Sequence, residues 1–204
     1  MKSTEKMRPT VLPRSLNAKH TALIIIDVQN EYFEKGRVTL PNAESAALMA
    51  KELLAWARDN QLTIIHMQHL SASPEGPVFL PDTWNVEINS SVQPLEGEIV
   101  IQKLYPSSFQ GTALQEMLDD RDIETLIVCG FMTHMCVEST VRDAFHRGYE
   151  IIVDNDACAT RDLPAAGVGA PISHDVIHQS SLASLNDLFA HAVEHKEVLS
   201  LSID

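Results

Sequence analysis

The hydrophobic positions of this 204-residue chain fall into two alternating patterns. One pattern is a short, continuous apolar run, often β-branched, which is typical of a strand buried on both faces of a sheet. Such runs predict strands at Leu23–Ile26, Leu62–Met67, Ile99–Gln102, Leu126–Cys129 and Ile151–Val153, and we expect a sixth strand, at an edge, at Val198–Ile203.

The other pattern is a stripe of apolar residues at helical spacing, and it lies between the strands. The clearest stripe runs from Ala43 to Arg58, where alanine and leucine recur every three or four residues. Further helices are predicted at Thr112–Leu118, at Val137–Arg147, with Gly148 placed to end it, and at Ser173–His191. This alternation predicts one α/β domain with a mostly parallel sheet of about six strands, covered on both faces.

Composition places the chain among ordinary globular proteins and excludes some classes of binding partner. Hydrophobic residues make up 45% of the chain, charged residues make up 21%, and the formal net charge is −13. Nucleic acids and anionic membranes select basic surfaces, so we expect neither as a partner. Three cysteines are too few for a disulfide framework, and we expect a reduced, cytoplasmic protein.

The first 19 residues differ in charge from the rest. They carry five basic side chains and one acidic side chain, and no apolar segment of signal-peptide length follows them. We expect an N-terminal arm over residues 1–19, either a surface strap or a flexible tail, and one folded domain over residues 20–204.

Three chemically active side chains stand where predicted strands end. Asp27 directly follows one strand, Lys103 follows another, and Cys136 comes shortly after a third, at the start of a predicted helix. Ligands of open parallel sheets bind beyond the carboxyl ends of the strands. A carboxylate, an ammonium and a thiol are therefore expected to meet at one edge of the sheet.

Each of these residues has a structural interpretation beside the catalytic one. Cys136 could be a nucleophile whose thiolate is stabilised by the helix N-terminus, or a packing residue at the helix start. Asp27 could cap a turn, or it could deprotonate Cys136 and then protonate a leaving amine. Lys103 alone could be a surface lysine, but beside the other two it would stabilise the thiolate. We interpret Cys129 as a core residue, and the role of Cys158 stays open.

These residues belong to the segments Asp27–Asn30, Lys103–Phe109 and Gly130–Val137. In content and order, the segments resemble the three catalytic motifs of the isochorismatase-like cysteine hydrolases, a superfamily that includes nicotinamidases and N-carbamoylsarcosine amidase. The likeness extends from about Thr21 to Phe189. It implies a three-layer α/β/α, Rossmann-like fold, with an isochorismatase-like hydrolase domain over residues 20–204.

The resemblance also implies a mechanism. Asp27, Lys103 and Cys136 would form a triad in which the thiolate attacks an amide-like carbonyl, the aspartate moves protons, and water cleaves the acyl-enzyme. A non-proline cis peptide bond is implied before Thr133, so that the backbone N–H groups of Thr133 and Cys136 form an oxyanion hole. True isochorismatases generally lack the cysteine, so C–N hydrolysis is favoured over vinyl-ether hydrolysis.

Metal binding is a point at which the chain departs from nicotinamidases, which typically build a metal site from an Asp-x-His pair and further histidines after the second strand. This chain instead has His66 and His69 there. Residues three apart in an extended strand point to opposite faces, so these two histidines are poor joint ligands. We expect neither a metal nor another cofactor, and nicotinamide is disfavoured as the substrate.

The substrate pocket is predicted from positions that follow the strand ends. Aromatic rings near the thiol would suit a small planar or apolar substrate, although core packing is an equal alternative for Phe33 and Phe109. The long, proline-containing segment 70–98 is expected to form a lid. The candidate pocket residues are Gln29, Tyr32, Phe33, His69, Trp84, Tyr105, Phe109, His134 and Met135.

The sequence therefore predicts a metal-independent cysteine hydrolase that cleaves an amide, ureido or carbamoyl C–N bond in a small molecule through an acyl-enzyme. Two alternatives stay open. One is a vinyl-ether hydrolase of the isochorismatase type that uses Asp27 without covalent catalysis, and the other is a catalytically silent homologue that binds a metabolite. The resemblance further implies a homodimer or homotetramer.

Overall fold

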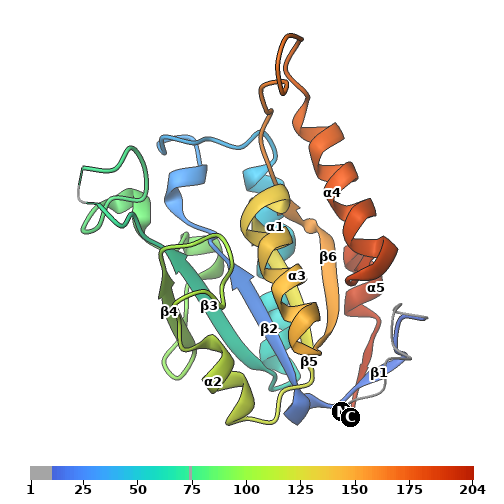
Figure 1. Ribbon diagram of the computed structural model, residues 1–204. Coiled ribbons are helices and arrows are strands. Elements are labelled where there is room, and N and C mark those ends of the chain that lie inside the picture. The colour runs from blue at the N-terminus through green and yellow to red at the C-terminus, as the bar shows by residue number, and fades with distance from the viewer. Residues whose placement is uncertain (1–10, 74) are drawn as a thin grey trace.

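Six parallel strands form the central sheet of the computed structural model, which describes residues 11–73 and 75–204. The strands lie in the order β4-β3-β2-β5-β6-β7 (Figure 1). Their bounds are β2 Thr21–Ile26, β3 Thr63–His69, β4 Ile99–Lys103, β5 Thr125–Phe131, β6 Glu150–Ala159 and β7 His191–Val193. The expected parallel sheet of about six strands is confirmed.

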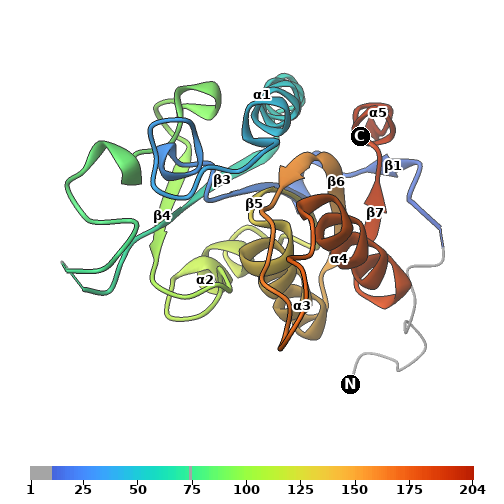
Figure 2. The ribbon, with the colours of Figure 1, turned by 90° about the horizontal axis from the view of Figure 1, so that it is seen from above.

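Helices cover both faces of this sheet and complete the expected three layers (Figure 2). Helices α1 (Ala43–Asp59) and α5 (His195–Leu199) pack on one face, and α2 (Leu114–Asp119), α3 (Glu138–Arg147) and α4 (His174–Leu188) pack on the other. No helix within the described residues has the length and apolar character that a membrane span needs. Shorter helical turns are η1 Ala18–His20, η2 Asn30–Tyr32, η3 Trp84–Val86, η4 Ser90–Val92 and the π-helical η5 Thr133–Val137.

The strand β2 supplies both hydrophobic cores because its successive side chains point to opposite faces. Leu23 and Ile25 enter the cluster beneath α1, whereas Ile24 and Ile26 enter the cluster beneath α2, α3 and α4. All six residues of β2 are buried, as the continuous apolar run predicted. This strand is the centre of the fold, and the chain that follows it begins the candidate site.

The expectation of a sixth strand at Val198–Ile203 is wrong. The sixth strand of the sheet is β7, and the predicted segment is divided between the end of α5 and β8 (Ser202–Ile203). A capping box formed by Glu194 and Glu197 starts α5, and Val198 anchors it in the core. Since α4 ends at Leu188, the predicted helix Ser173–His191 is also too long at its C-terminus.

The described part of the N-terminal arm is strapped to the C-terminus. β1 (Ser15–Leu16) pairs in parallel with β8, and the Ala18 N–H donates to the Asp204 carbonyl at 3.0 Å. Residues 1–10 of the arm lie outside the described residues. These contacts favour the strap over the tail for residues 14–18, while the boundary at residue 19 stays a prediction.

The chain leaves β2 toward β3 and β4 and then returns to the other side of β2 to form β5. A reversal of this kind opens a crevice at the carboxyl ends of the two inner strands. The ends of β2 and β5 approach closely because Gly130, with φ 118°, has no side chain. A Cβ there would come within 2.0 Å of the Ile26 carbonyl oxygen. The reversal therefore brings together the segments that follow Ile26 and Phe131.

One partly buried ion cluster ties α1 to the sheet. The Glu98 carboxylate accepts hydrogen bonds from Arg58 at 2.7 and 3.0 Å, from His66 Nε2 at 2.9 Å and from the Leu95 N–H at 3.0 Å. Burial alone would raise the pKa of Glu98, but these hydrogen bonds outweigh burial and lower the pKa to about 2. His66 lies in the middle of β3, whereas His69 is the last residue of that strand.

We expect Glu98→Gln to reduce the free energy of unfolding by roughly 2 kcal/mol near neutral pH, because the variant loses the charge that Arg58 pairs with. A depressed carboxyl pKa stabilises the folded state above the unfolded pKa, and this stabilisation is lost as the pH falls through the folded pKa. The difference in the free energy of unfolding between the wild-type protein and the variant should therefore disappear as the pH falls from about 5 to about 2. Urea unfolding across this range measures the effect, and a pH-independent difference would contradict it.

Candidate active site

A buried ion pair stands at the centre of the site. Lys103, the last residue of β4, places Nζ 2.7 Å from Asp27 Oδ2, and both side chains have an exposed fraction of 0%. Nζ also donates to the Tyr105 and Pro106 carbonyls at 3.1 and 3.3 Å. Burial acts to lower the pKa of Lys103, but Asp27 and then Cys136 outweigh burial and raise the pKa. The lysine is therefore an ammonium.

The thiol of Cys136 lies beside this ion pair. Cys136 is in η5, the turn that leads into α3, and only 4% of it is exposed. A carboxylate oxygen of Asp27, a ring nitrogen of His69 and the Cys136 sulfur all lie within 4.8 Å of one another. Both carboxylate oxygens of Asp27 are buried, and within the described residues their only charged partner is the Lys103 ammonium. The carboxylate therefore keeps capacity to accept a hydrogen bond next to the thiol.

The protonation state of Cys136 differs from the expectation of a thiolate stabilised by the helix start. Burial raises the pKa of the thiol strongly, and the Asp27 charge raises it further, while Lys103 offsets this only in part. The resting site is therefore a neutral thiol beside an aspartate–lysine ion pair. A thiolate can form only if its proton moves to a nearby base, and Asp27 is the base in position.

Two serines of the Lys103–Phe109 segment fasten its loop to α3. Ser107 Oγ donates to Asp143 at 2.7 Å, and the Ser108 N–H donates to Thr140 Oγ1 at 3.0 Å. The sequence analysis missed Thr140 and Asp143, because they are ordinary polar positions on a helix. The loop that these contacts hold supplies the two carbonyl groups that bind the Lys103 ammonium.

The side chain of Gln29 is hydrogen-bonded to the protein backbone and has a structural role. Its Nε2 donates to the His69 and Val86 carbonyls at 2.9 and 2.7 Å, and its Oε1 accepts from the His69 N–H at 2.8 Å. Gln29 is fully buried. The predicted substrate contact is thus replaced by backbone hydrogen bonds that join β3 and η3 to the end of β2.

The segment 70–98, which was expected to be a lid, is bound to the chain that follows Asp27. The Phe79 N–H donates to Glu31 Oε2 at 3.0 Å, Asn30 Nδ2 donates to the Trp84 carbonyl at 3.0 Å, and the Asn89 N–H donates to the Val28 carbonyl at 2.8 Å. Residue 74 lies outside the described residues. These contacts make the described part of the segment a wall of the site.

Four of the predicted pocket residues lie around the thiol or on the turn that carries it. Tyr32 packs edge-on against Phe131, which Phe33 also contacts. Burial raises the pKa of the Tyr32 hydroxyl, and the nearby Cys136 and Asp27 raise it further. Met135 and His134 belong to η5 itself. Met135 packs against both hydrophobic clusters, and His134 is hydrogen-bonded to Thr160.

The three other predicted pocket residues are two exposed residues and one core residue. Trp84 and Tyr105 are 45% and 53% exposed, and contact of their rings with a substrate stays a prediction. Phe109 is buried and stacks on Tyr149, which directly precedes β6 and so lies toward the amino ends of the strands. Of the two alternatives for Phe109, the structure therefore favours core packing. Tyr105 contributes its backbone carbonyl to Lys103 rather than its ring.

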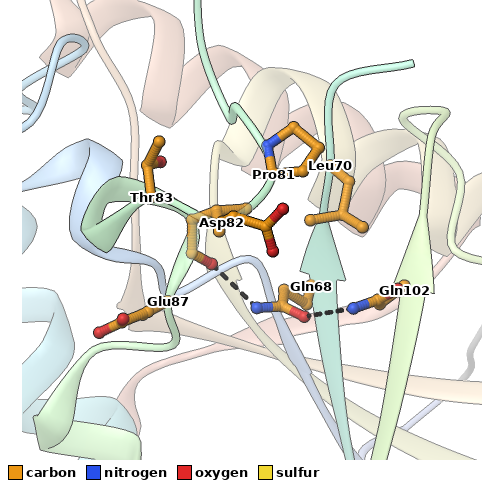
Figure 3. A pocket seen from close by; sticks show the side chains of 8 residues that line it. Gln68, Leu70, Pro81, Asp82, Thr83, Glu87 and Gln102 are labelled. Carbon is orange, nitrogen blue, oxygen red and sulfur yellow. Dashed lines mark hydrogen bonds between the residues drawn. The ribbon is translucent and has the colours of Figure 1, made fainter. Parts of the chain in front are cut away.

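A surface pocket of about 570 Å³ adjoins the site on the other face of the sheet (Figure 3). Gln68 and Gln102 line it, each one residue before His69 or Lys103, and adjacent strand residues point to opposite faces. Gln68 Nε2 donates to the Val86 carbonyl at 3.0 Å, the same oxygen that Gln29 binds. The pocket is therefore separated from the triad by the sheet.

The cis peptide bond lies one position earlier than expected. The structure has a non-proline cis bond between Phe131 and Met132, at the end of β5, and not before Thr133. Thr133 is fully buried, and its Oγ1 is hydrogen-bonded to His178 Nδ1 of α4 at 2.9 Å. The sequence analysis missed His178. The oxyanion hole at Thr133 and Cys136 stays a prediction.

The donor atoms of Asp27, His69 and Cys136 are close enough to suggest a metal site. The Lys103 ammonium, however, contacts two of these side chains, at Asp27 Oδ2 and at His69 Nδ1. A metal cation bound between them would be repelled by the ammonium. The described residues, as they are arranged, therefore do not fit a metal ion.

Comparison with known proteins gives a consistent result. The isochorismatase domain family model matches residues 21–197. The isochorismatase family protein YddQ of Bacillus subtilis is 42% identical over 83% of this chain and 93% of its own length. The secreted isochorismatase effector Isc1 of Verticillium dahliae is 33% identical over 92% and 95% of the two chains.

A cysteine hydrolase from Pseudomonas syringae pv. phaseolicola has a similar solved structure. Its TM-score is 0.85 at 29% sequence identity, and the match covers 90% of this chain and 92% of that chain. The arrangement of the described fold is thus shared with solved proteins over nearly its whole length.

Removal of the Asp27 charge should lower the pKa of the Cys136 thiol, because the carboxylate raises it in the wild-type protein. We expect the midpoint of the pH profile for iodoacetamide alkylation to move down by at least about one unit in Asp27→Asn. Labelling is measured by intact mass, with Cys136→Ala to correct for Cys129 and Cys158. An unchanged midpoint would show that the carboxylate does not act on the thiol.

Phe109→Leu tests the position of the Phe109 ring. Because the ring packs in the core, we expect the free energy of unfolding to fall by about 1 kcal/mol while the rate of Cys136 alkylation stays unchanged. Urea unfolding and the same alkylation assay measure the two quantities. A changed alkylation rate at unchanged stability would instead place the ring at the site.

Proposed function

Because this chain belongs to the isochorismatase family, we propose that it is a cysteine hydrolase that cleaves an amide, ureido or carbamoyl C–N bond in a small molecule. The single observation that carries the proposal is the buried Asp27 carboxylate, an oxygen of which lies within 4.8 Å of the sulfur of a thiol that is itself buried and neutral. A carboxylate in this position can take the thiol proton as sulfur attacks carbon.

The first half of the proposed reaction forms an acyl-enzyme. Cys136 Sγ bonds to the carbonyl carbon as Asp27 accepts the thiol proton. The resulting tetrahedral oxygen is stabilised by backbone N–H groups of η5, with Thr133 and Cys136 as the candidate donors. Asp27 then passes its proton to the nitrogen, the C–N bond breaks, and ammonia or an amine leaves. The product is a thioester on Cys136.

The second half of the proposed reaction regenerates the thiol. Asp27 accepts a proton from water as the water oxygen bonds to the thioester carbon. The C–S bond then breaks, the proton returns to sulfur, and a carboxylic acid is released. Lys103 donates no proton in this sequence. Its ammonium pairs with Asp27 Oδ2 at 2.7 Å and so holds the carboxylate in place beside the thiol.

The names of several relatives support C–N chemistry. A streptothricin hydrolase of Streptomyces noursei is 35% identical over 71% of this chain, although the match covers only 56% of that protein. More distant relatives are a nicotinamidase of Arabidopsis thaliana, at 27% identity, and a ureidoacrylate amidohydrolase of Variovorax paradoxus, at 28%. Their different substrates support the bond type and leave the substrate of this chain open.

The proposal is tested with a panel of small amides, ureides and carbamoyl compounds, assayed for ammonia release. We expect at least one compound to be hydrolysed and Cys136→Ala to lower kcat/KM by at least about 10³-fold, because no other thiol reaches the carbonyl. Intact mass after rapid quenching should show an acyl adduct on the wild-type protein that is absent from Cys136→Ala.

Cys129→Ala is the matched control, since Cys129 is a buried thiol within β5 and outside the triad. It should retain activity. Full hydrolysis of the preferred substrate by Cys136→Ala would overturn the mechanism. Loss of vinyl-ether hydrolysis on Asp27→Asn but not on Cys136→Ala would instead identify the non-covalent alternative.

A further inference from the structure

The surroundings of the His69 ring determine which of its two nitrogen atoms carries the proton. His69 is the last residue of β3, and its Nδ1 lies 3.2 Å from Lys103 Nζ. An ammonium has only N–H donors, so the Nδ1 atom that faces it presents its lone pair and carries no hydrogen. Burial lowers the pKa of His69, the Asp27 charge opposes this in part, and the Lys103 charge lowers the pKa further, so that a neutral ring is favoured. The ring proton of neutral His69 is therefore on Nε2.

The Nε2–H group faces a space that a ligand can reach. Within residues 11–73 and 75–204, Nε2 has no hydrogen-bond partner, and it is not among the nitrogen atoms sealed from solvent. The ring itself is held firmly. The His69 backbone is bound by Gln29, and the ring packs edge-on against Phe79 at 5.0 Å between centroids. The site thus presents a fixed donor that nothing in the described residues uses.

The position of His69 separates it from the proposed oxyanion hole. β3 and β5 lie on opposite sides of β2, so His69 and η5 flank Asp27. A carbonyl carbon bonded to Cys136 would direct its oxygen toward η5. The atoms attached to the other side of that carbon would then lie toward His69, whose ring nitrogen is within 4.8 Å of the Cys136 sulfur.

We propose that His69 is a specificity-determining residue whose Nε2–H group binds an acceptor oxygen next to the scissile carbonyl of the substrate. The substrate class is a small amide or ureide that carries a carboxylate or a second carbonyl group at that position. This inference rests on the proposed function. In this form His69 could not bind a metal ion through Nε2, because a protonated Nε2 has no lone pair to offer.

The tautomer can be measured without any substrate. Long-range ¹H–¹⁵N correlation spectra of the wild-type protein, labelled at its histidine rings, distinguish a protonated Nε2 from a protonated Nδ1. His69→Gln identifies the His69 signals by their loss. We expect the Nε2–H form near neutral pH. An Nδ1–H form or a doubly protonated ring would overturn the inference, whatever the catalytic activity.

Binding is tested on the full-length Cys136→Ala protein with two probes of similar size. Oxamate carries a carboxylate on its amide carbonyl carbon, whereas propionamide carries an ethyl group there. We expect oxamate to shift the His69 Nε2 signal and to bind at least about fivefold more tightly than propionamide, the ratio that the loss of one hydrogen bond of about 1 kcal/mol gives. Equal binding, or no shift with oxamate, would overturn the inference.

Two substitutions separate the two ring nitrogens. The amide of Asn lies near the position of Nδ1, and the amide of Gln lies near the position of Nε2. We expect His69→Asn to weaken oxamate binding by about tenfold, because it keeps the acceptor for Lys103 and loses the donor to the ligand. His69→Gln should stay within about threefold of wild type, since it replaces that donor. The reverse order would overturn the inference.

These outcomes differ from a failure of the proposed function. If Cys136→Ala kept full ammonia release, the cysteine mechanism would fail, but the tautomer and the oxamate measurements would still stand or fall separately. If hydrolysis required Cys136 and the His69 signals did not respond to oxamate, the proposed function would stand and the inference about His69 would fail.

Discussion

Burial of the Asp27–Lys103 ion pair is the constraint on which the rest of the site depends. Two charges without solvent lose several kilocalories per mole of hydration, and their mutual attraction compensates only when the remaining polar groups are satisfied. Lys103 meets this condition with two loop carbonyls and the His69 ring. Asp27 has the ammonium as its charged partner, but both of its oxygens lack a further hydrogen-bond donor within the described residues. This unsatisfied carboxylate is the part of the arrangement that stability alone does not explain.

The residues after Asp27 show how a short motif serves this constraint. Gln29, Asn30 and Glu31 are all buried, and each directs its side chain to a different part of segment 70–98 or to the end of β3. Their hydrogen bonds hold His69 against Lys103 and close the wall near Tyr32. A motif that resembles a catalytic signature thus contains one residue with a proposed role in the reaction, while the others position the neighbours of that residue.

Particular residues show how far prediction from the sequence reached and why it stopped. The positions at which β2 and β5 end were predictable from the sequence, because each apolar run is local. Their meeting at one edge was predictable as well, because the carboxyl ends of parallel strands share one edge of the sheet. β7 was not predicted because it has only three residues, one of them a histidine, and so shows neither the apolar run nor the alternation that is typical of a strand. Phe109 and Trp84 could not be assigned, because a ring after a strand end can turn inward or outward with the same sequence. The contact between His178 and Thr133 joins two segments that no pattern relates.

The sequence by itself determined the α/β order of the elements and the family resemblance, and it predicted the three residues of the proposed triad, because each depends on residue type and spacing along the chain. Only the tertiary structure decided the charge states: a neutral Cys136 thiol, a Lys103 ammonium and a neutral His69 ring. Those states follow from burial and from through-space contacts between residues that are distant in sequence. Proton affinity depends on the surroundings of a group, and the surroundings exist only once the chain has folded.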